Sequence, residues 1–346
     1  MLFRSTHGTH LRTNFDAVNS LPVSQISKGA LLTSTVTSPQ AVAAGIGLPY
    51  ASFPTGATVA RSLTPFPQYL GFNTDGALEN LGQSTYNALQ ASLQRRFHNG
   101  LNLMAAYTWS KTLTDADSAL PFFATLHGGG SAQNPFDLKG EKALSNQDVP
   151  QTLVLSYIYE LPVGKGKKFL PQGGALDKIV GGWEVSGIHR YQSGQPVSFC
   201  CASGIPNFAG AERFNQVLPN LYSAQFTGGN FNPVTDPMFN KAAFADPNAP
   251  ARINAGGGYV FGGMTRTEGW QRMPMFLSED FNLLKHIRVS DKVNAVVQAN
   301  FINAFNRHIF NRPPDLNPND GSFGIIDTNN TLETPRRVQL QLKVQW

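Results

Sequence analysis

Long hydrophobic runs are missing from this chain of 346 residues. A membrane-spanning helix needs about 18 or more consecutive apolar residues, and no run in the sequence approaches that length. The mean hydropathy is −0.20, and only 14% of the residues are charged. These values exclude a bundle of membrane helices. They do not exclude membrane-spanning strands, in which every second side chain is polar.

The sequence contains few cysteines, and its first residues show no export signal. The two cysteines, Cys200 and Cys201, are adjacent. Neighbouring cysteines close only a strained ring, so we predict no disulfide framework, and FCCASG resembles neither a zinc site nor a redox CxxC motif. The first residues, MLFRSTHGTHLRTNFD, contain no apolar core and no small-residue cleavage site. We therefore expect the chain to be the C-terminal part of a longer protein whose export signal lies upstream.

Positive charge is in modest excess. The chain has 27 Lys and Arg against 22 Asp and Glu, a net charge of +5. These basic residues are scattered instead of clustering with stacking aromatics, so we expect no nucleic-acid partner. They suit anionic lipid headgroups or lipopolysaccharide. The densest run, GKGKK at 164–168, lacks the Ser or Thr and the spacing of a phosphate loop, and we interpret it as a basic turn near lipid headgroups.

No grouping of residues predicts catalysis or metal binding. Ser193 has no His and carboxylate partners at a recognisable spacing. Asp115 and Asp117 lack the remaining ligands of a calcium site, so a solvated turn is the plainer interpretation. His189 and the vicinal thiols provide too few ligands for a metal. We expect no enzymatic activity, no cofactor and no metal.

Turn-forming and aromatic residues are abundant, with 33 Gly, 23 Pro and 24 Phe, which indicates many turns. The last residues, RRVQLQLKVQW, alternate strictly between apolar and polar, which predicts a strand with one apolar and one polar face. The pattern is typical of the terminal assembly signal of bacterial outer-membrane β-barrels, read by the barrel assembly machinery, with one face toward lipid and one toward water. The apolar set is Val338, Leu340, Leu342, Val344 and Trp346; the polar set is Arg337, Gln339, Gln341, Lys343 and Gln345.

Similar alternation recurs upstream and predicts about eight strands, at 2–11, 86–97, 101–112, 149–161, 183–191, 275–287, 293–305 and 336–346. The Asn-Gly turn at 99–100 predicts a hairpin between the second and third strands. Pro150 cannot donate a ladder hydrogen bond, which argues against the start of the fourth strand at 149. Glu279 interrupts the apolar face of the sixth. Glu184, Arg190 and Gln192 belong to the predicted polar, water-lining face, where they could contact a solute or satisfy one another.

The connections alternate between short and long. Those near residues 98, 162–182 and 290 are short or turn-rich, whereas 12–82 and 194–269 are predicted to be long irregular loops. Outer-membrane barrels have short periplasmic turns and long extracellular loops, so the sequence predicts an all-β, antiparallel transmembrane β-barrel, partial in extent. Aromatic residues near the strand ends predict two interfacial girdles. The outer girdle contains Tyr86, Tyr107 and Trp109, and the inner girdle Tyr157, Tyr159 and Trp183.

Several stretches resemble the C-terminal barrel of TonB-dependent receptors of the Oar-like group, which carry a carboxypeptidase-regulatory-like domain. They are YNALQASLQRRFHNGLNLMAAYTWSKTL, DVPQTLVLSYIYELPVGKGKKF, GGWEVSGIHRYQSGQPVSF, NFINAFNRHIF and RRVQLQLKVQW. The resemblance implies that residues 1–346 are the C-terminal portion of a large plugged barrel, without the plug or the segment that contacts TonB. The chain departs from the group at Pro150 and Gln151, where the group tends to have Arg and His.

Two functions are compatible with these patterns. The first is a fragment of a TonB-dependent receptor in the bacterial outer membrane, which moves an unidentified substrate in or out and contacts TonB only through its missing N-terminal part. The alternative is a non-transport structural or adhesive surface barrel that uses its long loops. A plug and a TonB-contacting segment encoded upstream would favour the first. We expect the isolated chain to be unstable in a bilayer, because an open sheet leaves its edges unsatisfied.

Overall fold

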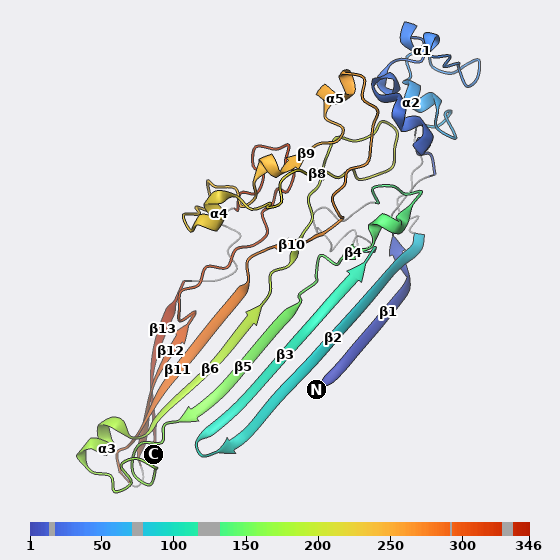
Figure 1. Cartoon of the computed structure of the whole chain (residues 1–346). Coiled ribbons are helices and arrows are strands. Elements are labelled where there is room, and N and C mark those ends of the chain that lie inside the picture. The colour runs from blue at the N-terminus through green and yellow to red at the C-terminus, as the bar shows by residue number, and fades with distance from the viewer. Residues whose placement is uncertain (14–17, 71–78, 117–131, 291–292, 327–334) are drawn as a thin grey trace.

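One large antiparallel sheet dominates the computed structural model (Figure 1). The structure describes residues 1–13, 18–70, 79–116, 132–290, 293–326 and 335–346. Eight long strands pair in the order β1-β2-β3-β5-β6-β11-β12-β13, and the short β4 pairs with β3. Within the described residues β13 does not pair with β1, so the sheet is open. The long strands are β1 (Leu2–Thr13), β2 (Glu79–His98), β3 (Leu101–Thr114), β5 (Gln151–Glu160), β6 (Trp183–Gln192), β11 (Phe276–Arg288), β12 (Asn294–Ile302) and β13 (Arg337–Gln345).

The prediction of about eight antiparallel strands is therefore confirmed. Most strand ends change by a few residues, but β2 begins at Glu79, inside the region predicted to be a loop, and not at Tyr86. Strand β2 is 20 residues long, more than the roughly 9–11 residues that a tilted strand needs to cross a bilayer. Strand β5 begins at Gln151, directly after Pro150, so the proline lies outside the ladder that it would interrupt. Its carbonyl still accepts from Ser110 N at 2.9 Å.

The three short connections meet at one end of the sheet, and the long segments extend from the other (Figure 1). The tightest is the β2–β3 turn, where Asn99 and Gly100 have φ of 51° and 80°. Positive φ at both positions is the requirement of a type I′ hairpin turn, which explains the Asn-Gly pair. Gly100 is required for a second reason, because an added Cβ would lie 2.8 Å from Glu160 O. We call the short-connection end the inner end and the opposite one the outer end.

The segments beyond the outer end are not structureless, contrary to the expectation of long irregular loops. Residues 18–70, 132–150, 193–275 and 303–326 contain short helices, short strands and many turns; we call them the loop body. Their elements are η1 (Val23–Thr33), α1 (Pro39–Ala43), α2 (Val59–Ser62), η2 (Leu138–Glu141), β4 (Ala143–Leu144), β7 (Pro196–Val197), β8 (Asn215–Gln216), α4 (Ala224–Gly228), η3 (Lys241–Ala243), β9 (Phe244–Ala245), α5 (Pro250–Asn254) and β10 (Glu268–Arg272). At the inner end, α3 (Ala175–Val180) lies between β5 and β6.

Two apolar clusters hold the loop body together. One contains many Phe rings, among them Phe199, Phe214 and Phe239. The other joins Leu32 of η1 to Ile253 of α5, two segments far apart in sequence. These buried side chains come from turns and short elements. Their positions in the sequence therefore follow neither the period of a helix nor that of a strand. That is why the sequence pattern missed an ordered body.

Cys200 and Cys201 are bonded to each other in a vicinal disulfide within the loop body. Because the bond joins neighbouring residues, it does not link distant parts of the chain as a disulfide framework would. None of the helices among the described residues is long and apolar enough to cross a membrane.

Candidate functional site: the polar face and the loop body

Strand register gathers the predicted polar residues on one face of the sheet. Residues directly opposite each other in an antiparallel pair point to the same side. Three members of the polar set of β13 lie opposite polar residues of β12: Gln345 opposite Asn294, Gln341 opposite Gln298 and Gln339 opposite Asn300. The other two lie opposite apolar residues, Lys343 opposite Val296 and Arg337 opposite Ile302. We call this side the polar face and the other the apolar face.

The candidates on β6 continue the polar face across the sheet. Glu184 lies opposite Leu284 of β11, and Gln192 lies opposite Thr152 of β5. Arg190 donates to Gln192 Oε1 at 2.6 Å, and its guanidinium lies 5.2 Å from the ring centroid of Phe276. Glu184 Oε2 is 3.7 Å from His286 Nε2. Arg190 and Gln192 therefore satisfy each other, and Arg190 remains exposed.

The apolar face carries the predicted assembly signal and the predicted aromatic residues. Val338, Leu340, Leu342 and Val344 all point to this side, and Leu340 is 79% exposed. Strand pairing puts five aromatic residues on the same side: Tyr107, Trp109, Tyr157, Tyr159 and Trp183. Tyr86, which we predicted to join the outer girdle, lies opposite Thr112 and therefore on the polar face. Trp346 follows the last residue of β13 and is 93% exposed.

One polar cluster interrupts the apolar face toward its outer end. His189 lies opposite Glu279, and both are almost fully buried, with 6% and 2% exposure. The His189 ring stacks on Tyr157, with centroids 5.5 Å apart, and on Tyr191 at 6.3 Å. Arg307 reaches Glu279 from the segment after β12 and pairs with it at 3.3 Å. The residue that broke the sequence pattern thus has a charged partner.

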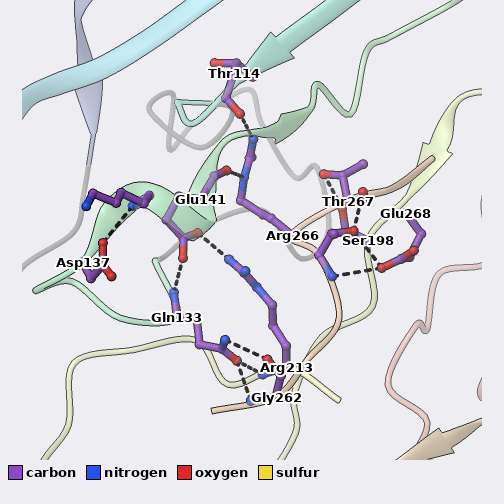
Figure 2. Close-up of polar contacts among 12 residues, drawn as sticks. Thr114, Gln133, Asp137, Glu141, Ser198, Arg213, Gly262, Arg266, Thr267 and Glu268 are labelled. Carbon is purple, nitrogen blue, oxygen red and sulfur yellow. Dashed lines mark hydrogen bonds and ion pairs between the residues drawn. The ribbon is translucent and has the colours of Figure 1, made fainter. Parts of the chain in front are cut away.

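A buried network joins two segments of the loop body, 132–150 and 193–275 (Figure 2). Arg213 forms an ion pair with Glu141, and both side chains are buried. Glu141 Oε1 also accepts from Gln133 N at 3.0 Å. The Gln133 side chain donates to Gly262 O and accepts from the backbone N of Arg213 and Gly262, each at 3.0 Å. Residues 133, 213 and 262 are therefore fixed to one another.

Two further arginines attach the loop body to the strands. Arg266 donates to the backbone carbonyls of Glu141 and of Thr114 at the end of β3 (Figure 2). Arg272 of β10 pairs with Asp148 at 2.8 Å, and Asp148 Oδ1 in turn accepts from Thr112 N of β3 at 2.7 Å. Backbone carbonyls and a buried carboxylate are strong acceptors for guanidinium groups. The loops are therefore anchored to the sheet by directional contacts.

A pocket of about 690 Å³ opens where β1 to β3 meet the loop body. Its apolar lining includes Phe3, Leu89, Trp109 and Trp270, and Lys111 lies among them. Trp270 is 93% exposed. The pocket has the volume and mainly apolar lining of small-molecule sites.

The structure gives no support to a calcium site at Asp115 and Asp117. Asp115 Oδ1 accepts from Gln83 N at 2.5 Å, which makes it a partner of the backbone. Asp117 lies outside the described residues. In the part of the chain that the structure describes, no group of three or more His, Cys, Asp or Glu residues gathers as metal ligands would.

Sequence reasoning missed the network residues Gln133, Arg213, Arg266 and Arg272. Each is a single polar residue in a segment without periodicity, and its partner lies far away in sequence. Gln133 and Gly262, for example, are 129 residues apart. No local signal in the sequence could have identified these pairs.

Comparison with known proteins identifies the class of chain that this fold and its two faces define. Residues 4–339 match the family described as "Outer membrane beta barrel domain". The chain belongs to that family, and its location is the bacterial outer membrane. No curated protein matches it significantly.

Two solved structures are similar to the chain. FpvA of P. aeruginosa, bound to heterologous pyoverdines, is 14% identical, with a TM-score of 0.29, over 76% of this chain and 20% of FpvA. The outer membrane transporter YddB from Escherichia coli is 10% identical, with a TM-score of 0.33, over 78% of this chain and 26% of YddB. The chain therefore spans about a fifth to a quarter of the length of these proteins.

Proposed function

We propose that this chain forms part of the barrel wall of a TonB-dependent outer-membrane receptor of the Oar-like group, and that it helps to move a substrate across the outer membrane. In this proposal residues 1–346 are the C-terminal portion of the barrel, and the plug and the TonB-contacting segment belong to other parts of the protein. TonB then contacts the receptor only through those parts. We assign the chain no enzymatic activity.

The observation that carries the proposal is the sorting of side chains by strand register. Glu184, Arg190 and Gln192 on β6 share a face with the polar set of β13, which includes Arg337, Gln339, Gln341 and Lys343. A sheet closed with this face inward has a water-filled lumen, and its opposite face meets lipid. The open edges at β1 and β13 fit pairing with further strands, because lipid does not tolerate unpaired strand edges.

Cysteine accessibility in the whole protein, inserted in the outer membrane, tests the assignment of the faces. In a background with Cys200 and Cys201 changed to Ser, we expect Gln341→Cys to react with a membrane-impermeant maleimide that is small enough to enter the lumen. Leu340→Cys, one residue away on the opposite face, should be protected by lipid. Equal labelling at both positions would contradict the lumen.

Transport is tested separately by measuring uptake or release of candidate solutes with and without a functional TonB. The proposal expects transport that depends on TonB and on the proton gradient. If deleting the protein changes no TonB-dependent movement of any candidate solute, the receptor function is rejected. The barrel assignment would remain intact.

The ordered loop body favours a second candidate, a structural or adhesive surface barrel. Adhesive loops need a fixed shape, and the network around Glu141, Gln133 and Arg213 provides one. The two functions differ in their energy requirement. Surface binding that persists without TonB, in a protein that transports nothing, would favour adhesion.

A further inference from the structure

The connection between β5 and β6, residues 161–182, is fixed to the apolar face of the sheet at its inner end. Trp183 Nε1 donates to Ile179 O in α3 at 2.9 Å. Lys285 Nζ donates to the same carbonyl at 3.1 Å and also to Gly181 O. Trp183 and Lys285 lie directly opposite each other on the apolar face. The end of α3 is therefore held against the side of the sheet that meets lipid.

This connection, which we call the inner turn, exposes large apolar side chains. Leu176 and Ile179 are three positions apart, on the same side of α3, and are 62% and 69% exposed. Phe169 is 53% exposed. Figure 1 shows α3 beyond the inner ends of the strands, away from the loop body. The apolar residues therefore project from the rim of the membrane-facing surface.

The inner turn is also basic. It contains four exposed lysines, Lys165, Lys167, Lys168 and Lys178, and one acidic residue, Asp177. The Asp177 carboxylate accepts from Lys165 N at 2.9 Å within the turn. Lys167 pairs with Glu160 at 2.5 Å, which leaves positive charge in excess. Apolar side chains next to a lysine cluster are the composition of segments that lie in a membrane interface.

We propose that the inner turn docks into the inner leaflet of the outer membrane and selects anionic glycerophospholipids. Leu176, Ile179 and Phe169 insert at the boundary between headgroups and acyl chains. Lys165, Lys168 and Lys178 contact lipid phosphates, since long lysine side chains reach the headgroup layer while their stems stay in apolar surroundings. Trp183 and Lys285 hold α3 at the required height. The proposal rests on the outer-membrane location and does not depend on transport.

Photo-crosslinking of the whole protein in the outer membrane tests the occupant of this surface. A benzophenone amino acid replaces Leu176 or Ile179, and the matched control replaces Leu218, an exposed residue of the loop body. We expect glycerophospholipid adducts at positions 176 and 179 and none at 218. A discrete protein adduct at 176 or 179, or no lipid adduct there, would overturn the proposal.

Lipid selectivity is tested with the purified protein in vesicles of phosphatidylcholine with and without phosphatidylglycerol. Each lysine at an anionic surface contributes roughly fivefold in affinity, so changing Lys165, Lys168 and Lys178 to Gln should abolish the preference for phosphatidylglycerol adducts. The control changes Lys139, Lys142 and Lys241 in the loop body to Gln and should preserve it. Heat-modifiable migration on gels verifies that each variant is folded. Equal adducts with both lipids in the unmodified protein would contradict anionic selectivity.

Discussion

Arg307 forms a two-point ion pair with Glu279, with Nη2 at 3.3 Å from Oε1 and Nε at 3.4 Å from Oε2. Glu279 is the residue at which the apolar alternation of β11 breaks, and it is 2% exposed. Arg307 lies 28 positions away, beyond β12. The break in the pattern is therefore a buried charge whose partner comes from a different segment.

Removing this partner should destabilise the barrel. Arg307→Ala leaves the Glu279 carboxylate buried without a counter-charge, and breaking a buried ion pair costs about 3–5 kcal/mol. Because Arg307 is itself 45% exposed, we expect a smaller loss, about 1–3 kcal/mol. Urea unfolding of the whole protein in micelles, followed by tryptophan fluorescence, measures the loss.

Two control variants make this prediction specific. Lys167→Ala removes an exposed ion pair with Glu160 and should cost less than about 1 kcal/mol. When Glu279 is already changed to Gln, Arg307→Ala should cost less stability than it does in the unmodified protein, because no charge is left buried. An Arg307→Ala loss no larger than that of Lys167→Ala would show that the pair is unimportant.

The two faces of β13 should tolerate charge unequally. Leu342→Lys places an ammonium on the apolar face, which costs about 2–4 kcal/mol near the middle of the bilayer. Gln341→Lys, one residue earlier, places the same group on the polar face and should cost little. The amount of heat-modifiable protein in isolated outer membranes measures both effects. Similar losses for the two variants would mean that the polar face does not line water.

The strands could be predicted from the sequence because their information is local. Each has a period of two, so Leu340 and Gln341 reveal their faces without reference to distant residues. The Asn99–Gly100 turn likewise follows from the positive φ that only a few residue types accept. The girdle assignment of Tyr86 was wrong, because this residue lies on the polar face of β2 although it is aromatic.

The loop body could not be predicted for the opposite reason. Glu141 and Arg213 are 72 positions apart, and Arg266 and Glu141 are 125 apart. Neither residue of such a pair belongs to a periodic segment, so only the folded structure brings them together. The same holds for α3, whose contact with Lys285 joins two segments more than 100 positions apart.

The ion pair of the loop body should control its order and leave the sheet unaffected. Arg213→Ala leaves Glu141 buried without its counter-charge, while Gln133 N still donates to it. We expect faster hydrogen exchange and proteolysis in 193–275 and unchanged protection in β3 and β5. Hydrogen exchange with mass spectrometry measures both regions. Lys241→Ala is the control, since Lys241 is exposed and its ammonium donates to Asp320 O; comparable loosening in this variant would refute a special role for Arg213.

Glu212 should make the stability of the loop body depend on pH. It is 5% exposed, and neither carboxylate oxygen has a hydrogen-bond partner within the described residues. Burial raises the pKa of Glu212 from 4.5 to about 7; Arg213 opposes this shift and Asp246 adds to it. The folded loop body therefore holds the proton more tightly than the unfolded chain does.

The sign of the effect follows from proton linkage. A carboxyl whose pKa is raised on folding contributes its full stabilisation below pH 4.5, and this contribution is lost as the pH rises to about 7. Glu212→Gln keeps a neutral side chain at every pH, so it should match the unmodified protein at pH 4 and exceed it in stability at pH 8. Hydrogen-exchange protection of 193–275, corrected for the intrinsic pH dependence of exchange, measures the difference. Parallel pH profiles for the two proteins would contradict the prediction, because they would show that the pKa of Glu212 is the same in the folded and unfolded states.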